Sequence, residues 1–269
     1  MRLRTAHVLA AVCLFLVGAG LAYAADVTVE CNKKKTTNFT SINTALATLA
    51  KQGPNTIHVS GPCKEAVVID GFDNLTLIAA GPGTSISDPT PSNLEDNDVV
   101  DILESRNVTV QGFTINGGVE GVACFQFSVC YLRELTVQGA SDSGVFFGRS
   151  SGFVDNSTIT GSSGNGVSAQ GSVVRLQGGN TINANGANGV VLRNTSTLAI
   201  SGADTITANG GNGVALGHLS FLRMGAATIS GNAAPDVNCS VTTAKTQGTG
   251  GSATPNLGGG TTNCTEPAP

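Results

Sequence analysis

The chain has 269 residues, of which 36 are glycine, 12% are charged and 4% are aromatic, and it has no tryptophan. An average soluble domain has about 25% charged residues and about 7% glycine, so charge is scarce here and glycine is abundant. This composition excludes a coiled coil or a helical bundle, and 40% hydrophobic residues with a net charge of −4 exclude a disordered chain. Nothing in the chain is basic enough to bind nucleic acid.

Residues 1–24 are predicted to be a secretory signal. Arg2 and Arg4 precede an apolar run without acidic residues from Val8 to Leu21, and Ala22-Tyr23-Ala24 matches the A-x-A cleavage signature. The run is shorter than the about 20 residues that a membrane span needs, and no later stretch replaces it. We therefore expect an exported protein, extracellular or periplasmic, with no membrane span after the signal is removed.

Six cysteines remain outside the signal, and they cluster in three sequential pairs. Six cysteines allow about 15 pairings, but the clustering favours neighbours in sequence, and an oxidising compartment favours structural bridges. A zinc site is disfavoured, because no C-x-x-C or Cys/His cluster has ligand spacing. The predicted disulfides are Cys31 with Cys63, Cys124 with Cys130, and Cys239 with Cys264.

Residues 25–54 are predicted to form an N-terminal cap made of a strand and a helix. The strand includes Val27-Thr28-Val29 and joins the first coil through Cys31 and Cys63. The helix is expected over 41–49, with Ser or Thr at its start and Gly53-Pro54 after it as a stop signal. One face of this helix is apolar and contains Ile42, Ala45, Leu46 and Leu49.

Residues 55–238 contain a repeat of 22–24 residues that is visible in two independent columns. Each repeat has three short apolar alternations separated by Gly, Asn and Ser turns, which predicts three short strands and leaves no room for a helix. The first column has Val122, Val145, Val167, Val190, Val214 and Val237. The second has Thr114, Thr136, Thr158, Thr181, Thr205 and Thr228.

Strand repeats of this length bury their apolar faces only by stacking on one another, so we predict an all-β, right-handed parallel β-helix of about 7–8 coils. The turns Asn180-Thr181-Ile182-Asn183-Ala184-Asn185-Gly186 and Thr205-Ile206-Thr207-Ala208-Asn209-Gly210 resemble the N-x-I-x-x-N repeat of the pectin-lyase-like superfamily. The resemblance covers most of residues 55–238 and implies the fold. Residues 239–269 are predicted to be a Gly/Thr-rich capping tail.

Strand alternation predicts which side chains face the core. The valine column and Ile115, Val137, Ile159, Ile182, Ile206 and Ile229 are expected to point inward. Asn185, Asn209 and Asn232 fall one coil apart at a turn, where we expect their amides to stack and bond to one another.

The acidic candidates are concentrated between two coils. Asp101 is predicted to project from a rigid strand, because Val100 and Ile102 point inward, and Asp101 with Glu104 is the candidate catalytic pair. A calcium site at Asp96, Asp98 and Asp101 is an alternative, and otherwise no cofactor is expected. The simpler interpretation of this segment is a solvated polar loop.

Four arginines are candidates for binding acidic sugars, since guanidinium groups suit carboxylates. Arg175 and Arg223 are expected at equivalent outward positions two coils apart, and Arg149 and Arg193 at neighbouring corners. The alternative is solubilising surface charge, and the outward residues between them make the face mixed: Tyr131, Phe153 and Ala199.

The catalytic motifs of the superfamily are absent from this sequence. Polygalacturonase-like members have Asn-Thr-Asp and Gly-His-Gly, where this chain has Asn180-Thr181-Ile182 and Gly217-His218-Leu219. The acidic calcium ligands of pectate-lyase-like members are also missing from most coils. Gly148-Arg149-Ser150-Ser151-Gly152 matches G-x-S-x-G, but it falls at a turn of the repeat and not between a strand and a helix.

We therefore expect a secreted, monomeric or weakly associating β-helix protein that binds extracellular carbohydrate without cleaving it, or that has a structural role at a surface. The alternative is a lyase or glycoside hydrolase that acts on an acidic polysaccharide. A remote alternative is an ice-binding face, since the threonine column is outward, although only two coils have threonine at both outward positions.

Overall fold

The computed structural model describes residues 24–33, 37–90, 98–239, 245–248, 262 and 264. Residues 1–23 of the predicted signal, Asp96 and most of the predicted capping tail lie outside these residues. Within the described residues, no helix is both long and apolar enough to cross a membrane.

The described chain forms three parallel sheets. Sheet A has β1 (Ala25–Glu30), β2 (Asn55–Ser60), β5 (Asp73–Ala79), β8 (Arg106–Gln111), β11 (Val129–Arg133), β14 (Ser151–Asp155), β17 (Val173–Gln177), β20 (Thr197–Ile200), β23 (Phe221–Met224) and β26 (Lys245–Gly248). Sheet B has β3 (Pro62–Lys64), β6 (Ser85–Ser87), β9 (Thr114–Asn116), β12 (Thr136–Gln138), β15 (Thr158–Thr160), β18 (Thr181–Asn183), β21 (Thr205–Thr207) and β24 (Thr228–Ser230). Sheet C has β4 (Val67–Asp70), β7 (Val100–Leu103), β10 (Val122–Phe125), β13 (Val145–Gly148), β16 (Val167–Gln170), β19 (Val190–Arg193), β22 (Val214–Leu216) and β25 (Val237–Cys239).

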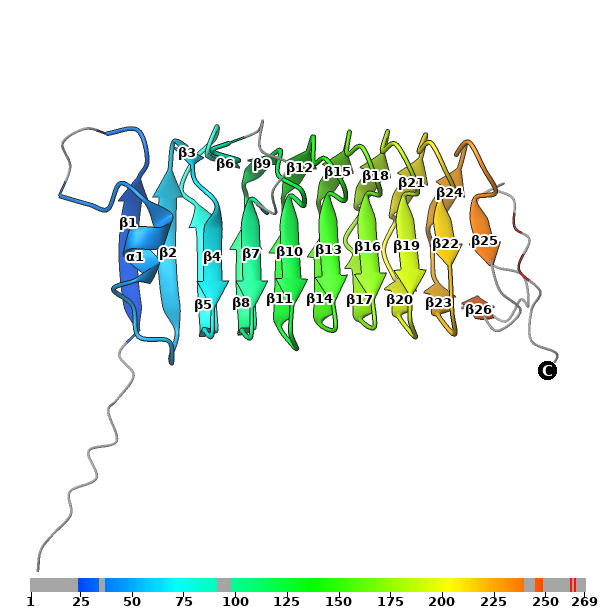
Figure 1. Ribbon diagram of the computed structural model, residues 1–269, viewed down its shortest axis with the longest axis horizontal. Coiled ribbons are helices and arrows are strands. Elements are labelled where there is room, and N and C mark those ends of the chain that lie inside the picture. The colour runs from blue at the N-terminus through cyan, green and yellow to red at the C-terminus, as the bar shows by residue number, and fades with distance from the viewer. Residues whose placement is uncertain are drawn as a thin grey trace, which may run out of the picture.

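The chain passes from sheet A to sheet B to sheet C in every coil and then enters sheet A again (Figure 1). Each strand pairs in parallel with the equivalent strands of the coils before and after it, and the eight strands of sheets B and C correspond to eight turns. The predicted parallel β-helix is confirmed.

The core is a stack of aliphatic rows, as the alternation predicts. Val122, Val145 and Val167 are in register with one another and have no exposed surface. Ile159, Ile182 and Ile206 form an equivalent buried row in sheet B. Every coil therefore contributes its apolar face to one continuous core along the axis.

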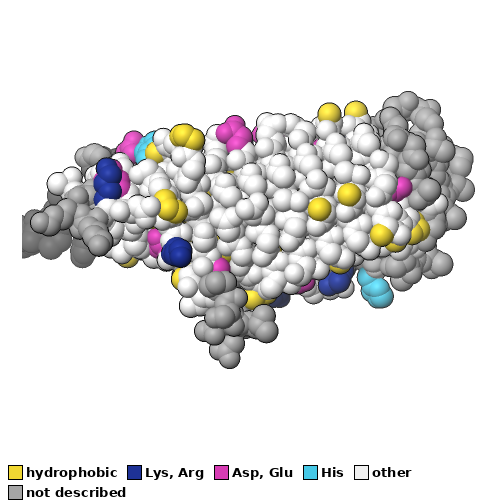
Figure 2. Space-filling view, turned by 90° about the horizontal axis from the view of Figure 1, so that it is seen from above, with side chains coloured by type: hydrophobic (Ala, Val, Ile, Leu, Met, Phe, Trp, Pro, Cys, Tyr) yellow, Lys and Arg dark blue, Asp and Glu magenta, His cyan; other side chains and the backbone are white. Residues whose placement is uncertain are grey.

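The outward face of sheet B is polar and almost uncharged. Its threonine row is in register from Thr114 to Thr228. Seen from the side where sheet B lies in Figure 1, few charged side chains interrupt a surface of uncharged polar groups and backbone (Figure 2). The scarcity of charge in the sequence thus has a structural cause, because short stacked strands present Thr, Asn and Ser outward.

The N-terminal segment joins the first coil as predicted, since β1 pairs in parallel with β2. The helix is shorter than the predicted 41–49: α1 (Ile42–Leu46) packs against β1, β2 and β4. Beyond Leu46 the backbone tightens, with Thr48 N–H donating to Ala45 O at 3.0 Å and Leu49 N–H donating to Leu46 O at 3.2 Å. The Glu65 carboxylate accepts hydrogen bonds from two backbone N–H groups in the first turn of α1, those of Ile42 at 2.8 Å and Asn43 at 3.1 Å.

All three predicted disulfides are present. Cys31–Cys63 ties the residue after β1 to β3. Cys239–Cys264 ties β25 to the C-terminal segment. Cys124–Cys130 joins β10 to β11 across one corner, and both of its cysteines are buried.

The predicted asparagine ladder is also present. The Asn185 side chain donates to Asn209 Oδ1 at 3.0 Å, and the Asn209 side chain donates to Asn232 Oδ1 at 2.9 Å. The same oxygens accept the backbone N–H of the preceding coil, so Asn185 N–H donates to Asn209 Oδ1 at 3.2 Å. The ladder satisfies buried backbone groups at a bend that the sheets leave unpaired.

Asn209→Ala is expected to lower the free energy of unfolding by about 2–4 kcal/mol, because it leaves two buried donors of Asn185 without an acceptor. Urea unfolding followed by circular dichroism measures the change. The control is Asn183→Ala, one coil away, whose buried amide oxygen has no hydrogen-bond partner among the described residues. Equal losses of stability in the two variants would contradict the role of the ladder.

Candidate functional site

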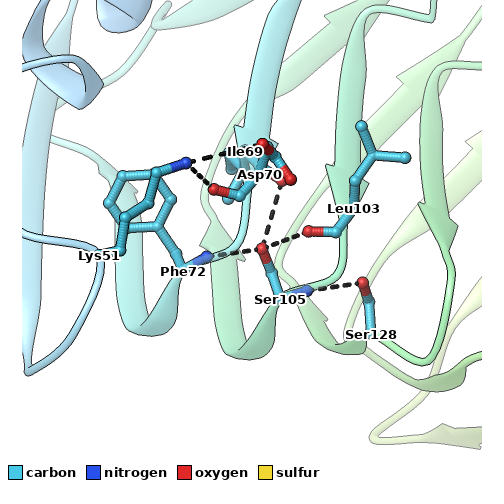
Figure 3. A network of polar contacts seen from close by, with 7 residues as sticks. All are labelled: Lys51, Ile69, Asp70, Phe72, Leu103, Ser105 and Ser128. Carbon is cyan, nitrogen blue, oxygen red and sulfur yellow. Dashed lines mark hydrogen bonds and ion pairs between the residues drawn. The ribbon is translucent and has the colours of Figure 1, made fainter.

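The corner between sheet C and sheet A is closed in six coils by a buried serine. Ser105 N–H donates to Ser128 Oγ at 3.0 Å, and Ser105 Oγ accepts from Phe72 N–H at 2.9 Å (Figure 3). Ser150 N–H donates to Ser172 Oγ at 3.1 Å and Ser172 N–H to Ser196 Oγ at 3.2 Å, so this serine ladder ties these corners to the next coil. The sequence analysis missed this row, although its spacing of 22–24 residues was readable: Ser105, Ser128, Ser150, Ser172, Ser196 and Ser220.

The residues just before these serines have a left-handed backbone. Glu104 has φ +46° and Arg149 has φ +50°, and each is the only residue between the sheet C strand and the serine. The corner after β10 has two such residues, Gln126 (φ +53°) and Phe127 (φ +64°). The additional residue makes this corner protrude, and Phe127 is 79% exposed.

The protruding corner is closed covalently from inside. Cys124 is the third residue of β10 and Cys130 is the second residue of β11, so their disulfide spans the segment that carries Gln126 and Phe127. A cross-link over so short a loop leaves the corner few alternative conformations. Phe127 is thus an exposed aromatic side chain on a rigid support.

Two adjoining depressions lie beside this corner, and we name them together the corner groove. Their volumes are about 550 and about 460 Å³, and both are lined by Gln126 and Arg149. The side chains of the corner groove are Glu104, Arg106, Phe125, Gln126, Phe127, Phe146, Arg149, Gln170 and Asn194.

Two aromatic rings and a glycine line one end of the corner groove. The centroids of Phe125 and Phe146 are 5.1 Å apart with the rings tilted by 45°. Both rings pack over Gly148, where a Cβ atom would lie 2.8 Å from the Phe146 ring and 2.9 Å from the Phe125 ring. A side chain at position 148 would push these rings aside, so the glycine leaves room for both.

The polar side chains of the corner groove are three amides, two guanidinium groups and the Glu104 carboxylate. Gln126, Gln170 and Asn194 each offer two N–H donors and a carbonyl acceptor. Arg106 lies 3.8 Å from Asp73, whereas Arg149 forms no ion pair with any residue that the structure describes. Apolar rings beside a few converging polar groups are typical of a small-molecule or sugar site.

Asp101 lies on the outward face of sheet C, in the row that also contains Phe146 of the corner groove. It is the second residue of β7, in register with Val68 and Ala123, and the next residue of this row is Phe146. Burial, and then the charges of Asp98 and Asp70, raise the pKa of Asp101 to about 6. Its Oδ1 atom is buried without a hydrogen-bond partner among the described residues.

The structure brings some predicted site residues together and separates others. Glu104 and Arg149 line the corner groove, while Arg175 and Arg223 line a separate depression on sheet A. Asp101 lies near Asp98 and not in the corner groove, so the catalytic pairing of Asp101 with Glu104 stays a prediction. The calcium site at Asp96, Asp98 and Asp101 also stays a prediction, because Asp96 is outside the described residues.

The expectation that Arg149 and Arg193 lie at neighbouring corners is wrong. Arg149 is a corner residue, whereas Arg193 is the last strand residue of β19, in register with Gln170 and, through it, with Gly148. The cause is corner length. Two residues separate Arg193 from the buried serine of its corner, whereas a single residue, Arg149, separates Gly148 from the buried serine Ser150.

The G-x-S-x-G match is structural. Ser150 is a buried member of the serine row, and its hydroxyl donates to the carbonyl of Cys124 at 2.8 Å. Its hydroxyl is used in a bond to the backbone, and Ser150 lies between two strands and not on the strand-to-helix turn that the nucleophile motif needs.

A family model described as "Periplasmic copper-binding protein (NosD)" matches residues 55–236. The chain belongs to the NosD family. The match covers the coils of the β-helix. Together with the three disulfides, it agrees with a secreted or periplasmic location of this NosD-family protein.

Solved structures of low sequence identity have the same fold. The pectin methylesterase PemA from Erwinia chrysanthemi is 10% identical, with a TM-score of 0.59 over 87% of this chain and 92% of that one. A pectin methylesterase in complex with a hexasaccharide is 9% identical, with a TM-score of 0.57 over 80% and 81%. No curated protein sequence matches the chain at a level that identifies a relative.

The described residues do not fit a copper site. Copper prefers thiolate, thioether and imidazole ligands. Cys31 and Cys63 lie close to Glu65, but the two sulfurs are bonded to each other. His58 pairs with Asp26 at 3.2 Å on β2, and His218 lies at a corner several coils away. The family's metal therefore has no ligand set in this part of the chain.

The raised pKa of Asp101 predicts a pH dependence of stability. A carboxyl with a folded pKa of about 6 and an ordinary unfolded pKa binds its proton more tightly in the folded state, so stability falls as pH rises from about 4 to about 6. Solvent screening reduces the effect to about 1–2 kcal/mol.

Asp101→Asn is expected to remove this fall and to unfold at an equal or higher temperature than wild type at pH 7. Thermal unfolding of both proteins at pH 4.5 and pH 7 tests it. Parallel pH profiles of the two proteins would contradict the assignment.

Proposed function

We propose that this exported β-helix protein binds an extracellular polysaccharide without cleaving it, and that the corner groove is the binding site. The observation that carries the proposal is Phe127, an aromatic side chain that is 79% exposed on a disulfide-closed corner beside Arg149. Most of the Phe127 side chain is exposed, so its ring is available to pack against a ligand beside the polar groups of the groove.

The side chains of the corner groove match the chemistry of sugars. A pyranose ring has an apolar face of C–H groups that packs on aromatic rings, and Phe125, Phe127 and Phe146 offer such surfaces. Sugar hydroxyls both donate and accept hydrogen bonds, which the amides of Gln126 and Gln170 can reciprocate. The Arg149 guanidinium adds a site for a carboxylate or a hydroxyl oxygen.

Rigidity of the corner favours binding. The backbone of the corner groove is held by the serine ladder and by Cys124–Cys130, so little conformational entropy is lost when a ligand binds. A hexasaccharide is bound in one solved structure of the same fold, and this supports a sugar ligand by analogy of fold alone.

Phe127→Ala and Arg149→Ala are each expected to weaken polysaccharide binding about tenfold or more, because each removes a contact worth about 1.4 kcal/mol or more. Affinity electrophoresis in gels containing a panel of neutral and acidic polysaccharides identifies the ligand, and calorimetry measures the affinity. The matched control is Leu219→Ala, which removes an apolar side chain, 59% exposed, just before the buried serine of another coil. Retention of none of the polysaccharides by the wild-type protein would leave a structural role for this surface.

A second candidate function is cleavage of an acidic polysaccharide, which one observation favours. The pKa of Asp101 is raised to about 6, which suits a group that exchanges protons near neutral pH. Asp101 shares the outward face of sheet C with the aromatic end of the corner groove, so one extended sugar chain could contact both.

Incubation with uronate polymers, with and without calcium, separates catalysis from binding. Unsaturated products and new reducing ends are followed by absorbance. We expect no product from wild type. Product formed by wild type and lost in Asp101→Ala would establish the enzyme in place of the binding protein.

A further inference from the structure

The outward face of sheet A carries a row of side chains that the proposed function does not use. The row runs through consecutive coils in register, from β11 to β23. Its members are Tyr131, Phe153, Arg175, Ala199 and Arg223.

The first half of this row is a stack of rings and guanidinium groups. The Tyr131 and Phe153 rings are nearly parallel, at 11°, with centroids 4.8 Å apart. Arg133 lies over the Tyr131 ring at 5.7 Å and Arg175 lies over the Phe153 ring at 5.5 Å. This stacking restricts the Arg175 side chain before any ligand arrives.

The second half of the row is a depression of about 360 Å³ between two arginines. Arg175 and Arg223 lie on either side of the small residue Ala199, and Gln177 and Ser201 supply polar groups. Neither arginine forms an ion pair with a residue that the structure describes. Two cations that flank a hollow, without an ion-pair partner among the described residues, form a site for an anionic ligand.

The spacing of the two arginines limits the ligand. They are two strands apart, which corresponds to about 10 Å between their backbones. One carboxylate accepts bidentate bonds from a single guanidinium, so the pair suits a ligand with two acid groups in succession. Gln177 and Ser201, an amide and a hydroxyl, match the hydroxyl groups of a sugar better than the backbone of an acidic peptide.

We propose that Arg175 and Arg223 form a second binding site, on sheet A, for successive carboxylate or sulfate groups of an anionic polysaccharide. The site lies on a different sheet from the face of sheet C that carries the aromatic end of the corner groove. A test of the sheet A site therefore does not depend on whether the corner groove binds sugar.

The test is a titration of the full chain with a defined oligogalacturonate and with a heparin oligosaccharide of similar length, at low and high salt. Arg175→Ala/Arg223→Ala is expected to weaken binding of at least one of them about tenfold or more at low salt and to reduce its salt dependence. The matched control is Arg133→Ala, an arginine of the same sheet that lies over the same stack outside the depression. Phe127→Ala is expected to leave this binding unchanged, which separates this site from the corner groove.

Equal affinity of wild type and the double variant for both oligosaccharides would overturn the proposal, and so would the absence of binding by wild type. Polyglutamate of similar charge is the competitor. If it binds as tightly as the oligosaccharides and shows the same loss in the double variant, the site recognises acidic groups of any polymer and the assignment to polysaccharide is wrong.

Discussion

Many corners of this protein depend on the next coil for their hydrogen-bond acceptors. The sheets satisfy the backbone groups of the strands, but the bends between them leave buried N–H groups without a sheet partner. Side chains of the following coil accept from them, as Ser128 does for Ser105, Asn180 for Ser157 and Asn209 for Asn185. Since an unpaired buried donor costs about 1–3 kcal/mol, coils stack in one register.

This register decides where function can be located. A stack of nearly identical coils presents nearly identical outward rows, so a binding site needs a local departure from the repeat. The corner after β10 is such a departure, because it has one residue more than its neighbours and a disulfide of its own. Phe127 protrudes there, while the corners of Glu104 and Arg149 keep their shorter form beside it. The insertion and the regular corners together make the corner groove.

Much of the fold could be predicted because the sequence period equals one turn of the β-helix. Residues one coil apart occupy the same place in the cross-section, so the inward valine and isoleucine rows, the asparagine ladder and the positions of Arg175 and Arg223 follow from counting. The sequential disulfides follow for the same reason, since each joins segments that are close in the coil path.

The site was harder to predict because it depends on exceptions to the period. Arg193 was misplaced because its corner is longer than that of Arg149, which moves Arg193 into the strand. Phe127 was missed because a single extra residue before Ser128 does not disturb the two columns that reveal the repeat. The raised pKa of Asp101 depends on burial, then on Asp98, and then on Asp70, which the coil path brings close from the preceding coil.

Hydrogen–deuterium exchange of the protein with and without its polysaccharide tests most directly whether the corner groove is the binding site. We predict slower exchange on binding for the backbone amides of residues 125–128 and 148–151, with the strands of sheet B unchanged. Unchanged exchange at these two corners in the presence of a bound polysaccharide, or protection confined to sheet B, would contradict the account.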